Sequence, residues 1–237
     1  MTRRRWIADT WTSETATLSG DQAAHLARVL RATPGQVFDV VAGGFLHRAE
    51  IITVTQNEVV FTLHEELESD VALPLHLLLA IFKFDHMEWA IEKATELGVA
   101  RITPIGARRT EKHLAQAAPK RAERWRRIAL EASKQSRRTT IPTIEDPSSL
   151  KAALEHEPSP TRILLSETEQ ATSIPAALAK SPLFDLALAI GPEGGWADDE
   201  MNLFTIHHWQ PVTLGPRILR AETAAIAAIA ITSSLYI

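Results

Sequence analysis

The stretch Ala189-Ile-Gly-Pro-Glu-Gly-Gly-Trp196 decides the fold, together with Leu214-Gly-Pro-Arg-Ile-Leu-Arg-Ala-Glu-Thr223 further along the chain. Each stretch begins where an apolar run that predicts a buried strand ends (186–190 and 211–214), and a helical pattern follows it. The glycines and the proline of the first stretch allow a sharp turn whose backbone approaches a ligand closely. Open α/β sheets bind small ligands at such turns, at the carboxyl ends of strands. We therefore expect a pocket built largely of main chain.

Both stretches belong to the larger part of the chain, which predicts an α/β domain over residues 72–237. Apolar runs that predict strands alternate here with amphipathic patterns that predict helices, so we expect a mainly parallel sheet with helices on both faces. Asp85 and Glu88 have the spacing of a capping box at the start of the first helix. The predicted strands are 75–82, 101–105, 162–165, 186–190 and 211–214, and the main predicted helices are 119–136, 174–180, 199–208 and 222–235.

Residues 1–71 predict a separate, smaller β domain. Three apolar runs, at 36–41, 46–54 and 58–63, are separated by turn residues and predict an antiparallel meander. One helix is expected at 21–30, with Ser19 and Gln22 as a capping box. His25, Arg28 and Arg31 of this segment could face RNA together with the N-terminal arginines, or could be a partly buried histidine and ordinary surface charge.

Composition narrows the class of protein. The 237 residues are 45% hydrophobic and contain no cysteine, which excludes disulfides, thiolate catalysis and zinc-thiolate sites and favours a cytoplasmic location. No apolar run approaches the roughly 20 residues needed to span a bilayer, and the basic start lacks the apolar segment of a signal peptide. His207 and His208 are neighbours that would point in different directions on a helix, so we expect no metal site.

The net charge of −4 hides one strongly basic segment. Between Arg101 and Arg138 the chain has twelve Lys and Arg against three Glu, a local net charge of +9. Such a patch attracts phosphates even on an acidic protein, because association responds to the local field. A solvated helix face is the alternative interpretation.

The two opening stretches, "IGPEGG" and "LGPRILRAET", also resemble signature motifs of the SPOUT methyltransferases, in particular the family that methylates N3 of a uridine in 16S ribosomal RNA. "HLARVLRATPGQ" (25–36), "KATELGVARITP" (93–104) and "EASKQSRRTTIP" (131–142) resemble further patterns of that family. The resemblance implies a C-terminal domain with a trefoil knot that binds S-adenosylmethionine, an N-terminal PUA-like β-barrel that binds RNA, and a homodimer acting on 16S ribosomal RNA within the small subunit. Lys134 and Arg108 depart from the family pattern, which usually has Glu at both positions.

The resemblance and the three strand ends together predict the residues that bind the cofactor and the RNA. The cofactor-binding candidates are Leu165, Ser166, Glu167, Ile190, Gly191, Pro192, Gly194, Gly195, Leu214, Gly215, Ile218, Leu219, Arg220 and Thr223. The RNA-binding candidates are Arg3, Arg4, Arg5, His25, Arg28, Arg31, Arg109, Arg124, Arg127, Gln135, Arg137 and Arg138.

The chemistry of the acceptor suggests three catalytic candidates. Uracil N3 is protonated at neutral pH, so the site must remove this proton or stabilise the anion that develops. We expect Arg220 to stabilise the anion and Glu222 to act as a base, unless Glu222 only stabilises the helix N-terminus; Arg138 would assist or hold a phosphate. Two other functions stay open at this point: a ribose 2'-O-methyltransferase on the same fold, and a non-catalytic RNA-binding assembly factor.

Overall fold

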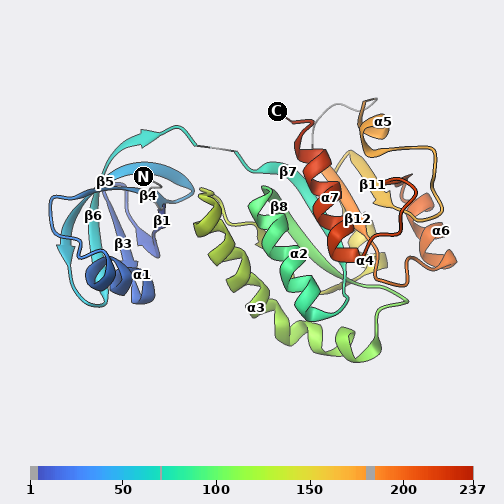
Figure 1. Cartoon of the computed structure of the whole chain (residues 1–237), viewed down its shortest axis with the longest axis horizontal. Helices are drawn as coiled ribbons and strands as arrows, with labels where there is room; N and C mark the ends of the chain where they lie inside the picture. The colour runs from blue at the N-terminus through green and yellow to red at the C-terminus, as the bar shows by residue number, and fades with distance from the viewer. Residues whose placement is uncertain (1–4, 70, 180–184, 237) are drawn as a thin grey trace. The chain divides into compact units, whose positions relative to one another are not determined.

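The strands of the chain fall into two separate sheets, in a computed structural model that describes residues 5–69, 71–179 and 185–236 (Figure 1). By their contacts, Met1–Val71 and Ser133–Thr140 form one unit, and Ala72–Ala132 and Ile141–Ile237 form the other. No helix of the described ranges is long and apolar enough to cross a membrane.

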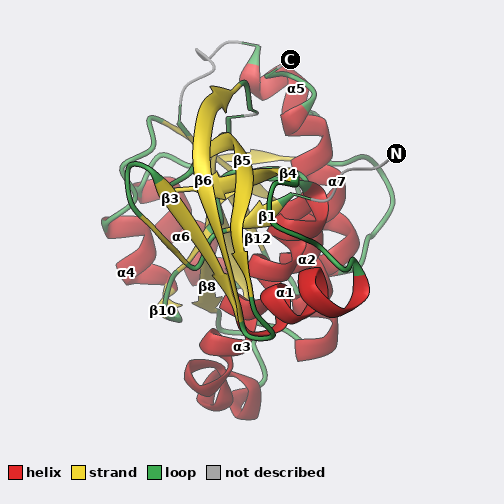
Figure 2. Cartoon of the chain, turned by 90° about the vertical axis from the view of Figure 1, so that its left-hand side faces the viewer, coloured by secondary structure: helices red, strands yellow, loops and turns green. Residues whose placement is uncertain are grey.

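The first unit is built on a curled sheet of six strands in the order β1-β4-β5-β6-β3-β2 (Figure 2). The two edge strands follow each other in the chain with only Ala8 and Asp9 between them, so the edges of the sheet lie near each other. The predicted meander is confirmed, since β4, β5 and β6 pair antiparallel in sequence order. The strands are β1 (Trp6–Ile7), β2 (Thr10–Trp11), β3 (Thr15–Ser19), β4 (Val37–Ala42), β5 (Phe45–Val54) and β6 (Glu58–Leu67).

The helix of this unit differs from the prediction. One turn of α-helix, α1 (Gly20–Ala24), continues directly as a π-helix, His25–Val29. The predicted capping box is wrong: the Ser19 hydroxyl donates to the Asp9 carboxylate at 3.0 Å, and the Gln22 amide donates to the Ile7 carbonyl at 3.0 Å. Both side chains therefore hold the connection between β1 and β2 and do not cap the helix.

The second unit contains the predicted parallel sheet, in the strand order β10-β8-β7-β12-β11-β13 with β9 beside β8. All of its pairs are parallel. The strands are β7 (Leu73–Ala80), β8 (Val99–Gly106), β9 (Thr143–Ile144), β10 (Ser148–Ser149), β11 (Thr161–Leu165), β12 (Leu186–Ile190) and β13 (Gln210–Val212). The helices are α2 (Phe84–Glu96), α3 (Lys112–Ser136), α4 (Leu150–Glu155), α5 (Ile174–Leu178), α6 (Asp198–Ile206) and α7 (Ala221–Ser233), and the last residues of α3, from Ser133 on, belong to the first unit.

Helices cover both faces of this sheet, as predicted. Along β12, Leu186, Leu188 and Ile190 face a core shared with α2, α3, α5 and α7, whereas Ala187 and Ala189 face a second core shared with α4 and α6. The strand is buried on both sides, which explains its uninterrupted apolar sequence. The trefoil knot that the resemblance implies stays a prediction.

Two details of the helices differ from the prediction. The second capping box is wrong, because Glu88 accepts hydrogen bonds from the Arg124 guanidinium at 2.6 and 2.8 Å and no side chain caps α2. Helix α3 begins at Lys112 and runs through Pro119, which we expected to be its first residue. A proline is compatible with a helix start, but it does not require one.

A buried polar cluster joins β7 to the loop after α4. The His76 ring contacts the Glu157 carboxylate through Nδ1 and the Thr103 hydroxyl through Nε2, the latter at 2.7 Å. The Ser159 backbone N–H also donates to Glu157, at 2.9 Å, and Glu157 is only 4% exposed. Burial alone would raise the pKa of Glu157, but the hydrogen bonds from His76 and Ser159 lower it to about 2.

We predict that this cluster stabilises the fold in a pH-dependent way. Because the pKa of Glu157 is lower in the folded chain, its contribution is complete above about pH 4.5 and is lost as the pH falls towards about 2. The contribution is on the order of 3 kcal/mol. Unfolding free energies measured between pH 6 and pH 3 should fall less steeply for Glu157→Gln than for the wild type. Glu155→Gln, at an exposed site two residues earlier, should keep the wild-type slope; equal slopes in all three proteins would contradict the prediction.

Candidate active site

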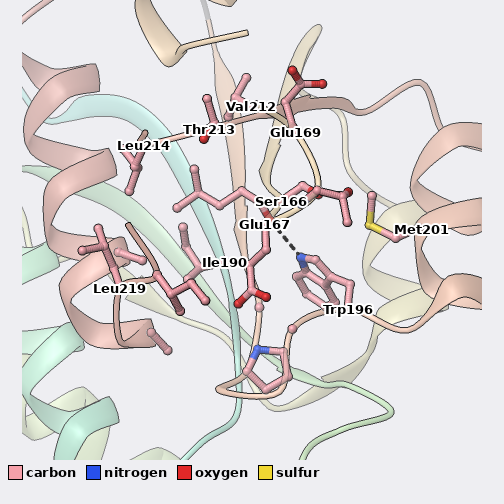
Figure 3. A pocket seen from close by; sticks show the side chains of 18 of the residues that line it. Ser166, Glu167, Glu169, Ile190, Trp196, Met201, Val212, Thr213, Leu214 and Leu219 are labelled. Carbon is pink, nitrogen blue, oxygen red and sulfur yellow. Dashed lines mark hydrogen bonds between the residues drawn. The ribbon is translucent and has the colours of Figure 1, made fainter. Parts of the chain in front are cut away.

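Three neighbouring strand ends enclose a cavity of about 560 Å³ (Figure 3). Strands β12, β11 and β13 lie side by side and run parallel, so the loops that follow them meet at one edge of the sheet. Apolar side chains contribute to the lining, notably Leu165, Ile190, Leu214 and Leu219. A cavity of this size suits a nucleoside-sized ligand.

The loop after β12 is shaped by its glycines. A Cβ atom on Gly191 would lie 3.2 Å from the Trp196 indole, so a larger residue would push against this ring. Gly195 has a φ of +70°, a conformation that favours glycine, and its N–H donates to the Pro192 carbonyl at 2.8 Å. The sequence therefore gives this loop one tight conformation, with its backbone exposed to the cavity.

Two hydrogen bonds join the three loops. The Trp196 indole N–H donates to the Leu165 carbonyl at the end of β11, at 3.2 Å (Figure 3). The Ser166 N–H donates to the Val212 carbonyl at the end of β13, at 3.1 Å. The glycine loop and the end of β13 are thus both bonded to the end of β11.

A fourth loop, after β8, supports the glycine loop. The Arg109 guanidinium donates to the Gly194 carbonyl, while the Arg108 N–H donates to the Glu200 carboxylate at 2.8 Å. Arg109, which we expected to bind RNA, therefore lines the cavity. The side chain of Arg108, where the family pattern usually has Glu, forms an ion pair with Asp199 of α6 at 2.7 Å.

Most of the cofactor-binding candidates line this cavity. They are Leu165, Ser166, Glu167, Ile190, Gly191, Pro192, Gly195, Leu214, Gly215, Ile218 and Leu219. Gly194, Arg220 and Thr223 lie outside the lining. The lining also includes residues that we did not predict from the sequence, among them Trp196 and, on α6, Asp198, Met201 and Asn202. Trp196 closes the first opening stretch, so its place beside the glycines was an available signal, whereas nothing in the sequence set the α6 residues apart from the rest of their helix.

The three catalytic candidates have different surroundings. Arg220 is exposed and stands at the N-cap position of α7. Glu222 is 2% exposed and turns towards α2, where its carboxylate contacts His86 Nδ1 at 2.8 Å. Arg138 is 9% exposed, and burial lowers its pKa to about 10. Neither Glu222 nor Arg138 lines the cavity.

The RNA-binding candidates are divided between the two units. Arg5, His25, Arg28, Arg31, Gln135, Arg137 and Arg138 belong to the first, and Arg109, Arg124 and Arg127 to the second, while Arg3 and Arg4 lie outside the described residues. The Arg5 guanidinium donates to the Arg137 carbonyl, and Arg28 donates to the Gln56 side chain at 3.1 Å. Arg31 and Gln135 are exposed.

Much of the charge of the basic segment is paired with acids from outside it. Arg124 bonds to Glu88, Arg126 bonds to Asp146, and Arg101 lies 3.6 Å from Glu157. Arg127 is exposed and makes no ion pair with any residue in the described ranges. The local excess of +9 in the sequence therefore overstates the free positive charge. No group of three acidic, histidine or cysteine side chains suited to a metal occurs in the part of the chain that the structure describes.

Comparisons with known proteins agree with this geometry. Residues 69–233 match the model of an RNA methyltransferase domain, and residues 18–63 match that of an RNA methyltransferase PUA domain. The chain is 34% identical to ribosomal RNA small subunit methyltransferase E of Synechocystis over 93% of its own length and 73% of the relative, and 30% identical to that of Bacillus subtilis over 92% and 90%.

Two solved structures of methyltransferases have the same fold as this chain over nearly its whole length. The ribosomal RNA small subunit methyltransferase E of Neisseria gonorrhoeae bound to S-adenosyl methionine is 30% identical, with a TM-score of 0.84 and 98% of both chains covered. A putative methyltransferase of Legionella pneumophila with the bound cofactor SAM is also 30% identical, with a TM-score of 0.84 over 99% and 98% of the two chains. On the domain match and on these whole-chain similarities, the chain belongs to the RNA methyltransferase family that includes ribosomal RNA small subunit methyltransferase E.

Proposed function

We propose that the chain methylates N3 of a specific uridine in 16S ribosomal RNA, with S-adenosylmethionine as the methyl donor. The observation that carries the proposal is the backbone-lined cavity at the ends of β11, β12 and β13, in a chain whose relatives include S-adenosyl methionine-bound structures. Residues 72–237 would hold the donor and residues 1–71 would dock the RNA. A cytoplasmic location and action within the small ribosomal subunit are part of the proposal, and cell fractionation with ribosome sedimentation would check them.

Mass spectrometry of ribosomal RNA nucleosides tests the proposal directly. Cells that lack the protein should lack 3-methyluridine at one position of the 16S RNA, and the wild-type gene should restore it. A missing 2'-O-methylated nucleoside would assign the ribose reaction instead. An unchanged set of modified nucleosides would leave only a non-catalytic role.

The residues of the cavity fit the proposed donor. When bound, S-adenosylmethionine supplies a methyl group on a positively charged sulfur. The cavity offers apolar walls at Leu165 and Leu219, main-chain groups of the glycine loop, and carboxylates that favour a cation. These groups would hold the donor in the orientation that an in-line displacement requires.

Arg220 is the residue proposed to assist the acceptor. The nucleophile is the N3 lone pair, which becomes reactive only as the N3–H proton leaves to solvent and negative charge grows on the uracil imide. A fixed guanidinium stabilises this charge without itself losing a proton. Arg220 directly precedes Ala221, which lines the cavity, so the end of its loop adjoins the proposed donor site. The Glu222 carboxylate is hydrogen-bonded to His86 of α2, which favours a role in fixing α7 over a role as the base.

We predict that Arg220→Ala slows methyl transfer about 100- to 1000-fold at neutral pH, the usual cost of removing one preorganised donor. Single-turnover rates with small-subunit RNA would measure this, and calorimetry should show nearly unchanged affinity for S-adenosylmethionine. The rate of the variant should rise with pH as the imide ionises unaided. Arg220→Lys, which keeps the charge, should recover part of the rate. A wild-type rate in Arg220→Ala would make the residue structural and would contradict the proposal.

We propose that α3 contributes phosphate contacts, and two neighbouring arginines allow a matched test. Arg127 is exposed, whereas Arg126 is held by Glu123, Asp146 and the Ile144 carbonyl. Arg127→Ala should lower the slope of log affinity against log salt by about 0.7 to 0.9, the value for one phosphate contact. Arg126→Ala should leave the slope unchanged. Equal slopes in both variants and the wild type would remove Arg127 from the RNA site.

We also propose a homodimer in which α7 contributes to the interface. Ala230 is exposed on this apolar helix, and Ile226 and Ala227 are partly exposed beside it. Analytical ultracentrifugation at micromolar concentration should give about twice the chain mass of 26.2 kDa. Ala230→Arg should yield the monomer. A wild-type chain that sediments only as a monomer would contradict the proposal.

A further inference from the structure

One carboxylate points into the middle of the cavity. Glu167 follows β11 by two residues, and Figure 3 shows its side chain between Leu219 and Ile190 on one side and Trp196 on the other. Its Oε2 atom lies 3.7 Å from the position that a Cβ on Gly195 would occupy. The acid therefore lies directly over the glycine turn that forms the wall of the cavity.

Glu167 is held in place by its backbone and not by its carboxylate. The Ser166 and Thr168 hydroxyls bond to each other at 2.9 Å across it, and the Thr168 N–H donates to the Ser166 hydroxyl at 3.3 Å. Within the described ranges, the Glu167 carboxylate has no hydrogen-bond or ion-pair partner. The side chain is exposed and its charge is unpaired within those ranges, so the carboxylate is available to a ligand.

The neighbouring acid of the same loop differs in this respect. The Glu169 carboxylate accepts the backbone N–H groups of Ala171 and Thr172 at 2.7 and 2.8 Å. These backbone hydrogen bonds lower the pKa of Glu169. The Glu169 carboxylate thus stabilises the conformation of the loop, whereas the Glu167 carboxylate makes no such hydrogen bond.

The charge of the donor changes during the proposed reaction, and this change identifies a task for Glu167. The acceptor lone pair forms the new bond to the methyl carbon, and the electron pair of the broken sulfur–carbon bond stays on sulfur. The sulfonium becomes a neutral thioether, while the ammonium and carboxylate of the amino-acid part are unchanged. The donor carries a net charge of about +1 at neutral pH and the product about 0. A nearby carboxylate attracts the donor more strongly than the product.

We propose that Glu167 is the specificity residue that discriminates S-adenosylmethionine from S-adenosylhomocysteine. The inference rests on the proposed function and deepens it. In the wild type the attraction between the carboxylate and the sulfonium favours donor binding, and the loss of this attraction after transfer favours release of the product. The residue acts on binding and exchange at the cavity, and it takes no proton from the RNA.

Calorimetric titration of both compounds into the RNA-free protein tests the proposal. The wild type should bind the donor about tenfold more tightly than the product, as expected for one partly screened charge pair. Glu167→Gln should reduce this ratio to about threefold or less by weakening donor binding, with product affinity unchanged. Glu155→Gln is the matched control, because it removes the same charge from an exposed site outside the cavity lining and should keep the wild-type ratio.

The possible outcomes separate this proposal from the proposed function. A wild-type ratio in Glu167→Gln, or an equal loss of ratio in Glu155→Gln, would overturn the role of Glu167 alone. A wild-type chain that binds neither compound would overturn the methyltransferase function itself. If Glu167→Gln also loses product binding, Glu167→Asp decides: it keeps the charge and should keep a preference for the donor, and a ratio near one would overturn the proposal.

Discussion

The parallel pairing of β12 with β11, and of β11 with β13, is the constraint on which the rest of the second unit depends. Leu164 is paired with Ala189 and Leu165 with Val212, so the three strands end at nearly the same level. Each strand is followed directly by a turn, so the three turns lie next to one another at the same edge of the sheet. The cavity is thus a consequence of strand register, and its side chains refine a shape that the backbone already sets.

The strands and their turns could be predicted because their signals are local. A fully buried strand such as β12 needs an apolar run, and a turn with a positive φ needs a residue such as Gly195, so both leave a mark on consecutive residues. The capping boxes failed for the opposite reason. The spacing of Ser19 and Gln22, or of Asp85 and Glu88, is compatible with a cap, but Ser19, Gln22 and Glu88 have partners contributed by other elements.

The same limit separates the predictable part of the site from the rest. Strand ends indicated where the cavity would form, but they did not indicate which side chains from neighbouring loops would reach it. Arg109 arrives from the end of β8, 85 residues before the glycine it contacts. A charge count along the chain could not anticipate that Asp146 and Glu88 neutralise Arg126 and Arg124. The free charge of a surface depends on its ion pairs, and most of the ion pairs of this segment join residues that are distant in sequence.

The hydrogen bond from Trp196 to Leu165 divides the cavity into a rigid half and a compliant half. The glycine loop is hydrogen-bonded to the end of β11 through Trp196 and to the loop after β8 through Arg109 and Gly194. These walls of the cavity are therefore fixed to one another. The loop after β13 is more exposed: Ile218 lines the cavity yet is 84% exposed, and Gly215 has a φ of +105°. Ligands that differ in bulk would be accommodated on this side, at the cost of ordering an apolar side chain that water now surrounds.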